Sequence, residues 1–157
     1  MNDPPIIHCG KLIIAGASGD GNDTGAVWDV FERKSEVAPL RGKRSDNGYE
    51  IRVYQDNACG IHVGCAVADA QPQPPHTLFE LPASHYAVFE VRVANGYDSE
   101  NKAMEAWLQS NPMGYWQKLL DGASYVIEYY DERFRGNEPD SIVEIWIPIE
   151  KKKRSLP

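Results

Sequence analysis

Gly48-Tyr49-Glu50-Ile51-Arg52-Val53-Tyr54 has a counterpart of similar pattern in Ala123-Ser124-Tyr125-Val126-Ile127-Glu128-Tyr129, about 76 residues later in a chain of 157. Both stretches are rich in aromatic and β-branched residues, which favour strands. Two alike strands at this distance indicate an internal repeat of half the chain. The segments around the two stretches also follow the same order, and this order predicts the fold.

The first half of the chain has the pattern of a strand, a helix and a hairpin. Val27, Trp28 and Phe31 recur with the period of a helix, and Asp56-Asn57 is a turn-forming pair. The elements expected are a strand over residues 12–17, a loop over Ser18–Asp23, a helix from Thr24 to about Glu36, and strands over Tyr49–Gln55 and Gly60–Asp69.

The second half repeats that order after an extended connection with three prolines, Gln71–His76. Met104, Trp107 and Leu108 line up on one helical face. The elements expected are a strand over Tyr86–Val93, a loop with Asn95-Gly96, a helix from about Ser99 to Ser110, a helical turn from Asn111-Pro112 to Gly122, and strands over Tyr125–Arg133 and Ile142–Ile149.

These elements predict an α+β fold in which two β-α-β-β units are related by a pseudo-two-fold axis. We expect one domain over residues 1–157, with halves at about 8–70 and 78–150 and a basic tail at 151–157. Two such units can join edge to edge into a mostly antiparallel sheet with both helices on one face. The other face is expected to be open, with a central cleft for a ligand.

Composition and charge limit the classes of partner and indicate the cellular compartment. The formal net charge of −7 disfavours direct binding of nucleic acid, because a phosphate backbone would be repelled. No run approaches the roughly 18 apolar residues of a membrane span, and the N-terminus lacks the pattern of a secretory signal. We therefore expect a cytoplasmic protein that does not enter the membrane. Whether it pairs with itself or with a partner protein is left open.

Motifs for metals and cofactors are weak. Cys59, His62 and Cys65 lie within seven residues, but strand alternation would place His62 on the opposite face from the two thiols. We expect no metal, and Cys9, Cys59 and Cys65 as free thiols. The Gly-rich stretch 16–21 lacks the Gly-Lys-Ser/Thr of a phosphate loop, so no cofactor is expected. No catalytic residue is assigned, because no nucleophile motif is present.

The last expected strand carries the densest chemical signal. Val143, Ile145, Ile147 and Ile149 alternate onto one face, which leaves Glu144 and Trp146 together on the other. The preceding strand adds three tyrosines, Tyr125, Tyr129 and Tyr130, and a further acid, Glu128. A carboxylate among aromatic rings suits an organic cation. The alternative without a binding role is a solvated acid beside a tryptophan that covers its neighbours.

Three segments together resemble the GyrI-like small-molecule-binding domain, which is also the effector-binding module of bacterial AraC-type and MerR-type multidrug-responsive transcription regulators. They are Tyr86–Val91, the helix around Trp107, and Val143-Glu144-Ile145-Trp146-Ile147-Pro148-Ile149. The resemblance implies a tandem β-α-β-β fold that binds lipophilic, often cationic aromatic compounds around a glutamate. It gives that role to Glu144 and proposes Trp146, Tyr125, Trp28 and Tyr49 as further ligand-binding residues.

The resemblance leaves several functions open. A stand-alone form is expected, because the binding module starts within about ten residues of Met1. Stand-alone relatives are binders, modulators of DNA gyrase, or hydrolases of cyclopropane-bearing toxins, and the last would need Glu144 or Glu128 as a general base. Binding is preferred over hydrolysis, because it requires only complementarity between ligand and site.

Overall fold

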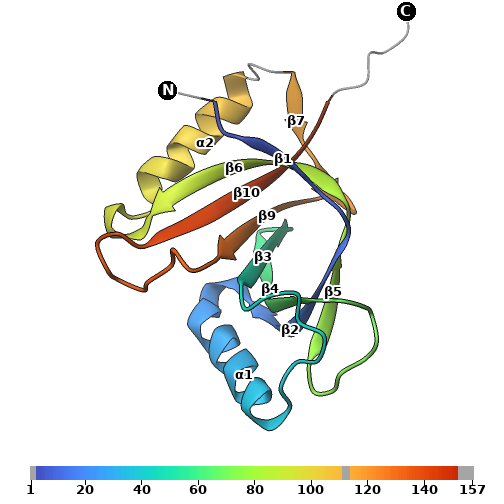
Figure 1. The fold of residues 1–157 in the computed structure, drawn as a ribbon. Helices are drawn as coiled ribbons and strands as arrows, with labels where there is room; N and C mark the ends of the chain where they lie inside the picture. The colour runs from blue at the N-terminus through green and yellow to red at the C-terminus, as the bar shows by residue number, and fades with distance from the viewer. Residues whose placement is uncertain (1–2, 111–113, 152–157) are drawn as a thin grey trace, which may run out of the picture.

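The computed structural model describes residues 3–110 and 114–151 (Figure 1). Two short 3₁₀ turns, η1 (Gly21–Asp23) and η2 (Val93–Asn95), precede the two helices. The helices and strands are β1 (Ile6–Cys9), β2 (Leu12–Asp20), α1 (Thr24–Val37), β3 (Gly48–Gln55), β4 (Ala58–Val67), β5 (Thr77–Leu81), β6 (Ser84–Arg92), α2 (Asp98–Ser110), β7 (Tyr115–Gln117), β8 (Leu119–Leu120), β9 (Ala123–Tyr130) and β10 (Ile142–Lys151).

The described strands form one antiparallel sheet in the order β1-β6-β10-β9-β3-β4-β2-β5, with β7 added on β10 and β8 on β9. The centre is the junction of β3 and β9, where Ile51 pairs with Ile127, which lies 76 residues later. Outward from this junction, the two halves present their strands in equivalent order. The predicted α+β fold with a tandem β-α-β-β repeat is confirmed.

Both helices cover the same face of the sheet. Side chains of directly opposed residues in antiparallel strands point to one face. Glu50 pairs with Val63 on β4 and with Glu128 on β9, and Glu128 in turn pairs with Ile145 on β10. Val63 belongs to the apolar cluster under α1, and Ile145 to the cluster under α2. The helices therefore lie one on each half of this face, as predicted (Figure 1).

The opposite face is closed, so the expectation that it would be the open one is wrong. A long antiparallel sheet twists, and here it curls until its far face encloses a core of its own. Tyr86 and Tyr125 are completely buried in that core. Its other buried members are Leu12, Ile14, Tyr49, Ile51, Ala66, Leu81, Val88, Ile127 and Trp146. Open space must therefore be sought on the helical face.

The hairpin of β3 and β4 has the predicted turn. Asp56 and Asn57 have φ values of 50° and 65°, and a two-residue loop with both central φ positive is the type I′ turn that suits twisted hairpins. Asp and Asn tolerate this conformation better than other residues with side chains. The turn fixes the register in which Tyr49 lies opposite Gly64.

The loop predicted over Ser18–Asp23 is strand as far as Asp20, because β2 continues through this Gly-rich segment. Gly16 lies opposite Gly64, and a Cβ on Gly16 would come within 1.8 Å of the carbonyl oxygen of Val63. The glycine thus permits close approach of β2 and β4.

Other differences concern short strands. The sequence did not predict β1 and β5, which form the two edges of the main sheet. The helical turn expected up to Gly122 is wrong, because β7 and β8 occupy the segment from Tyr115 to Leu120. Its start at 111–113 lies outside the described residues. The predicted basic tail, 151–157, also lies outside them apart from Lys151, which ends β10.

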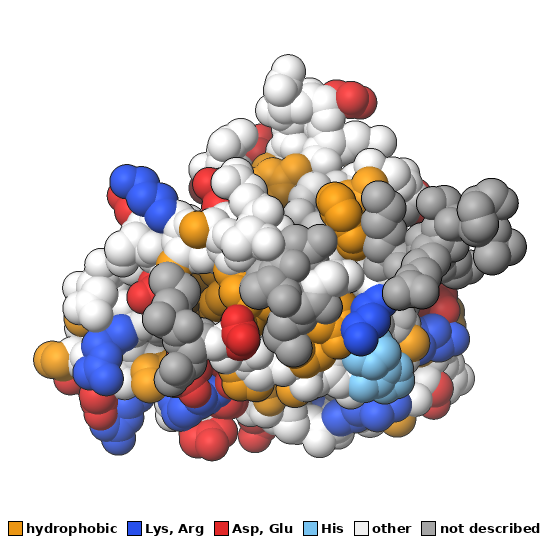
Figure 2. Space-filling model, turned by 90° about the horizontal axis from the view of Figure 1, so that it is seen from above, with side chains coloured by type: hydrophobic (Ala, Val, Ile, Leu, Met, Phe, Trp, Pro, Cys, Tyr) orange, Lys and Arg blue, Asp and Glu red, His pale blue; other side chains and the backbone are white. Residues whose placement is uncertain are grey.

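The surface shows charges of both signs. On the face in Figure 2, Lys and Arg side chains are interspersed with Asp and Glu among the described residues. Cys9, Cys59 and Cys65 are free thiols, as predicted. Within the described part of the chain, neither helix has the length and hydropathy needed to cross a membrane.

His62 is buried, and both of its ring nitrogens contact groups of the fold. The residue lies on β4 and is 2% exposed. Its two ring nitrogens contact the carbonyl oxygen of Ile14 and the hydroxyl of Ser18, both at 2.8 Å. Burial disfavours the charged imidazole and lowers the pKa of His62 from its ordinary 6.5 to about 4, although the bond to Ile14 opposes this shift.

We expect His62 to make the fold acid-sensitive. Below pH 6.5 the histidine is protonated in the unfolded chain but stays neutral in the folded one. Stability therefore falls as the pH drops from 6.5 towards 4. The loss should reach about 2–3 kcal/mol in unfolding free energy. Urea unfolding at several pH values in this window, on the protein and on His62→Gln, measures it. An equally steep pH dependence in His62→Gln would contradict the prediction.

Candidate functional site

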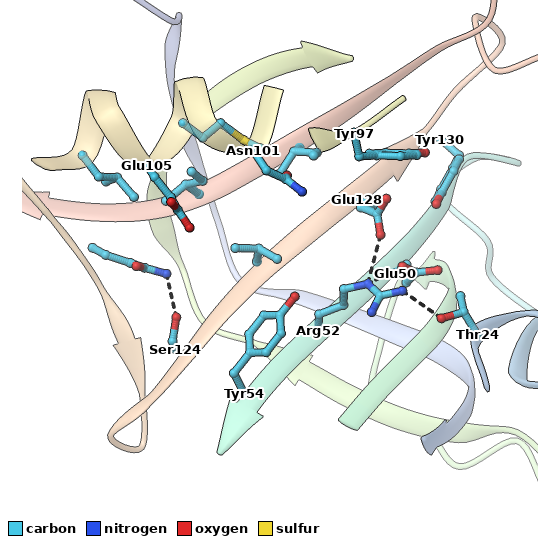
Figure 3. A pocket seen from close by; sticks show the side chains of 16 residues that line it. Thr24, Glu50, Arg52, Tyr54, Tyr97, Asn101, Glu105, Ser124, Glu128 and Tyr130 are labelled. Carbon is cyan, nitrogen blue, oxygen red and sulfur yellow. Dashed lines mark hydrogen bonds and ion pairs between the residues drawn. The ribbon is translucent and has the colours of Figure 1, made fainter. Parts of the chain in front are cut away.

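A cavity of about 720 Å³ lies on the helical face, over the junction of the two halves (Figure 3). Its size is in the range of small-molecule sites. The floor is formed by β3, β9 and β10, and α2 forms one wall. The lining residues are Thr24, Glu50, Arg52, Tyr54, Tyr97, Asn101, Met104, Glu105, Leu108, Gln117, Ser124, Val126, Glu128, Tyr130, Ile145 and Ile147.

The lining divides into an apolar part and a charged part. Ile145 and Ile147 on β10 and Met104 and Leu108 on α2 form the apolar part. Tyr97 and Tyr130 lie near Glu128, and Tyr54 lies beside Arg52, as Figure 3 shows. A ligand with aromatic rings could therefore bury them against aliphatic side chains while its polar or charged part meets the acids.

The charged part follows from strand alternation at the central junction. Glu50 and Arg52 are two residues apart on β3, so both point into the cavity. Glu128 is the direct cross-strand partner of Glu50. The pairing of β3 with β9 therefore brings two carboxyl groups side by side, within reach of one guanidinium.

Arg52 holds both acids through one atom. Its Nε lies 2.8 Å from Oε2 of Glu50 and 3.1 Å from Oε2 of Glu128. Its Nη2 donates to the hydroxyl of Thr24 at 2.8 Å (Figure 3). Trp28 on α1 donates its indole N–H to the second oxygen of Glu50, also at 2.8 Å. The guanidinium is thus fixed between the helix start and the two carboxyl groups.

The pKa values of the two acids are shifted in opposite directions. Glu50 and Glu128 have side chains that are only 1% and 12% exposed. Burial, together with the hydrogen bond and the repulsion from Glu50, raises the pKa of Glu128 to about 8, although Arg52 opposes this. Burial would also raise the pKa of Glu50, but hydrogen bonds from Glu128, Trp28 and Arg52 hold it below its ordinary value.

The tyrosines around the acids stay neutral. Burial, reinforced by the nearby charges of Glu128 and Glu50, raises the pKa of Tyr97 to about 12 and raises that of Tyr130 further. Neutral phenol rings beside a carboxylate offer π faces that attract a cation. The cavity thus combines an acid pair, aromatic rings and aliphatic walls.

Four of the five residues proposed from the sequence lie elsewhere. Glu144 is ion-paired with Arg133 and accepts the indole N–H of Trp146 at 2.8 Å. Trp146, Tyr125 and Tyr49 lie in the core of the opposite face, where the ring of Trp146 is 6.0 Å from that of Tyr49. None of these four lines the cavity, so the expectation that Glu144 faces the cleft is wrong.

Trp28 is brought to the site, though not into its lining, because its indole positions Glu50. A ligand in the cavity would meet Glu50 and Glu128 rather than Glu144. Sequence reasoning noted Glu128 as a further acid and as an alternative general base, and it left out Glu50. The available signal was the pair Glu50 and Arg52, which share a face on an otherwise apolar strand.

Two comparisons with known proteins match most of the chain. A family described as "Cass2: Integron-associated effector binding protein" matches residues 15–149. The transcriptional regulator BrlR of Pseudomonas aeruginosa is 33% identical over 138 residues, which are 84% of this chain and 48% of BrlR. The chain thus spans about half the length of that curated relative.

Solved structures show the same fold. SAV2435, determined bound to tetraphenylphosphonium, has a TM-score of 0.70 at 13% identity, over 95% of this chain and 94% of that one. The integron cassette protein VCH_CASS2, from the mobile metagenome of Vibrio cholerae, has a TM-score of 0.57 at 13% identity, over 95% and 97%.

The curled sheet, the two helices on one face and the cavity at the repeat junction define an effector-binding domain of the GyrI-like type, as the sequence resemblance implied. Within that class, the chain belongs to the Cass2 family of integron-associated effector-binding proteins.

We expect Arg52 to be needed for stability as well as for the site. Arg52→Met leaves two buried carboxyl groups without a counter-charge, which should cost roughly 2–4 kcal/mol of unfolding free energy at pH 8.5. The loss should shrink at pH 5, where the pair can take up protons. Urea unfolding at both pH values measures it.

The matched control is Lys11→Met, which breaks the exposed ion pair with Glu80 at 2.9 Å. Pairs of this kind contribute less than about 1 kcal/mol. Equal losses for Arg52→Met and Lys11→Met would show that the acid pair does not depend on Arg52.

Proposed function

We propose that the domain binds lipophilic organic cations in the cavity at the repeat junction. The carrying observation is that two buried acids, Glu50 and Glu128, share a single arginine among aromatic and aliphatic walls. When both acids are ionised, the trio has one negative charge in excess. A monovalent cation with apolar substituents complements both the charge and the walls.

The polarity of the lining supports a delocalised cation over a compact one. A small, strongly hydrated ion would lose its water shell in a space bordered by Ile145, Ile147 and Val126. A cation whose charge is covered by aromatic groups loses less on desolvation and gains from burying apolar surface. Tyr97 and Tyr130 add ring faces beside the acids.

The comparison with SAV2435 suggests a probe. That protein was determined bound to tetraphenylphosphonium, a lipophilic cation, and its fold is similar to this one over almost the whole chain. An affinity in the micromolar range requires about −8 kcal/mol, which one excess acid and several rings can supply. The natural ligand is defined here by its chemistry: a monocation with aromatic surface.

Regulation through another protein stays a prediction, as do the hydrolase and gyrase-modulator alternatives. The relationship to the transcriptional regulator BrlR supports a role in effector sensing. Hydrolysis would require Glu50 or Glu128 to activate a water beside the ligand.

We expect the two acids in the cavity, and not Glu144, to select cations. At pH 8.5, Glu50→Gln and Glu128→Gln should each weaken tetraphenylphosphonium by about 1–3 kcal/mol, because each leaves one carboxylate that Arg52 already neutralises. Isothermal titration calorimetry measures the affinities. Binding of triphenylphosphine oxide, a neutral aromatic compound, should change little.

Glu144→Gln is the matched control, because Glu144 is bound to Arg133 and Trp146 outside the cavity. It should leave tetraphenylphosphonium binding unchanged, and circular dichroism checks that all variants keep the fold. Loss of cation binding in Glu144→Gln alone would return the site to the opposite face. Absence of saturable binding by the unmodified protein would remove the proposed function.

A further inference from the structure

The acid pair at the junction lacks half of its counter-charge. Glu50 and Glu128 are direct cross-strand partners, and both contact the same Nε of Arg52, at 2.8 and 3.1 Å. Two buried carboxyl groups this close cannot both be ionised cheaply beside a single guanidinium. The remaining charge must be met by a bound cation or, in the empty cavity, removed by a proton.

We propose that a proton and the cationic ligand are alternative occupants of the Glu50–Glu128 pair, so that ligand binding expels one proton. This inference rests on the proposed function and specifies how its site is regulated. The empty site holds one proton on the pair and is close to electroneutral with Arg52. When a cation enters, the proton leaves to solvent and the pair becomes fully ionised.

The groups that face the pair from each surrounding element support this charge count. Arg52 is the single cationic side chain among the described residues that line the cavity. From α1, Thr24 contributes a neutral hydroxyl that accepts from Arg52, and Trp28 contributes a neutral indole donor. Among the described lining residues, β10 contributes only Ile145 and Ile147. The titratable groups nearby are Tyr54 on β3, Cys59 on β4, Tyr130 on β9, Tyr97 before α2 and Glu105 on α2.

The protonation of the two acids is consistent with this exchange. Burial and the proximity of Glu50 raise the pKa of Glu128 to about 8, whereas the pKa of Glu50 is lowered. The exchanged proton therefore belongs mainly to Glu128. Tyr97, with its pKa raised to about 12 by burial, stays protonated throughout the range from pH 6 to pH 9.

The exchange predicts a defined pH dependence. A cation that must displace a proton binds more weakly as the pH falls below the pKa of the pair, with a tenfold loss per pH unit. The dissociation constant of tetraphenylphosphonium should thus be roughly 100-fold higher at pH 6 than at pH 9, and should level off above pH 8. The probe has a permanent charge, so its own titration cannot produce this effect.

Proton release can be counted directly. Titration calorimetry at pH 6.5 in phosphate and in Tris, which differ in ionisation enthalpy, should give about one proton released per cation bound. At pH 9.5 the number should fall close to zero, because the pair is then ionised before binding. Triphenylphosphine oxide, which carries no charge, should release no proton.

Two variants separate the pair from other acids in the cavity. Glu128→Gln mimics the protonated state permanently, so its weak cation binding should be independent of pH from 6 to 9. Glu105→Gln removes an acid that lines the same cavity from α2. Among the described residues Arg52 pairs with Glu50 and Glu128 and not with Glu105, so this variant should retain the full pH dependence. Circular dichroism at each pH confirms that the variants remain folded.

The outcomes distinguish the two proposals. Saturable binding of tetraphenylphosphonium with the same affinity at pH 6 and pH 9, and no proton release, would overturn the exchange while leaving the proposed function intact. No binding at any pH up to 9.5 would overturn the proposed function and the exchange with it. A steep pH dependence that persists in Glu128→Gln would place the exchanged proton elsewhere and overturn the assignment to this pair.

Discussion

The cross-strand pairing of Glu50 with Glu128 against Arg52 is the constraint on which the sheet junction and the cavity both depend. At the offset of 76 residues that relates the halves, Arg52 corresponds to Glu128, whereas Glu50 corresponds to Val126. One half thus supplies a cation where the other supplies an acid, and these two charges alone would cancel. Glu50 adds an acid without a counterpart, so the charge imbalance at the axis comes from divergence between two otherwise similar units.

Local periodicity explains which parts of the fold could be predicted. The stripe of Val27, Trp28 and Phe31 and the Asp56-Asn57 turn each lie within a dozen residues, so the sequence predicts α1 and the β3–β4 hairpin almost to their observed bounds. The edge strands β1 and β5 are held by pairing with β6 and β2, far along the chain. Short strands that depend on distant partners leave little periodic signal of their own.

The site could be predicted only in part, because alternation shows which residues share a face but not which face encloses space. Glu144 and Trp146 do lie opposite Ile145 and Ile147, as the pattern indicated. The curl of the whole sheet then closes the face of Trp146 with other aromatic residues and leaves Ile145 and Ile147 bordering the cavity. Curl arises from the twist of all strands together, and no single strand encodes it.

The two faces thus divide stability and binding between them. The closed face buries large aromatic and aliphatic side chains, and such burial supplies most of the stability of a domain. The helical face can therefore keep features that oppose folding, namely apolar side chains around a hollow and an acid pair with half its counter-charge. A lipophilic cation, the ligand proposed above, would relieve both features by covering the apolar lining and neutralising the excess acid. The properties that destabilise the empty cavity are therefore the same ones that would select the proposed ligand.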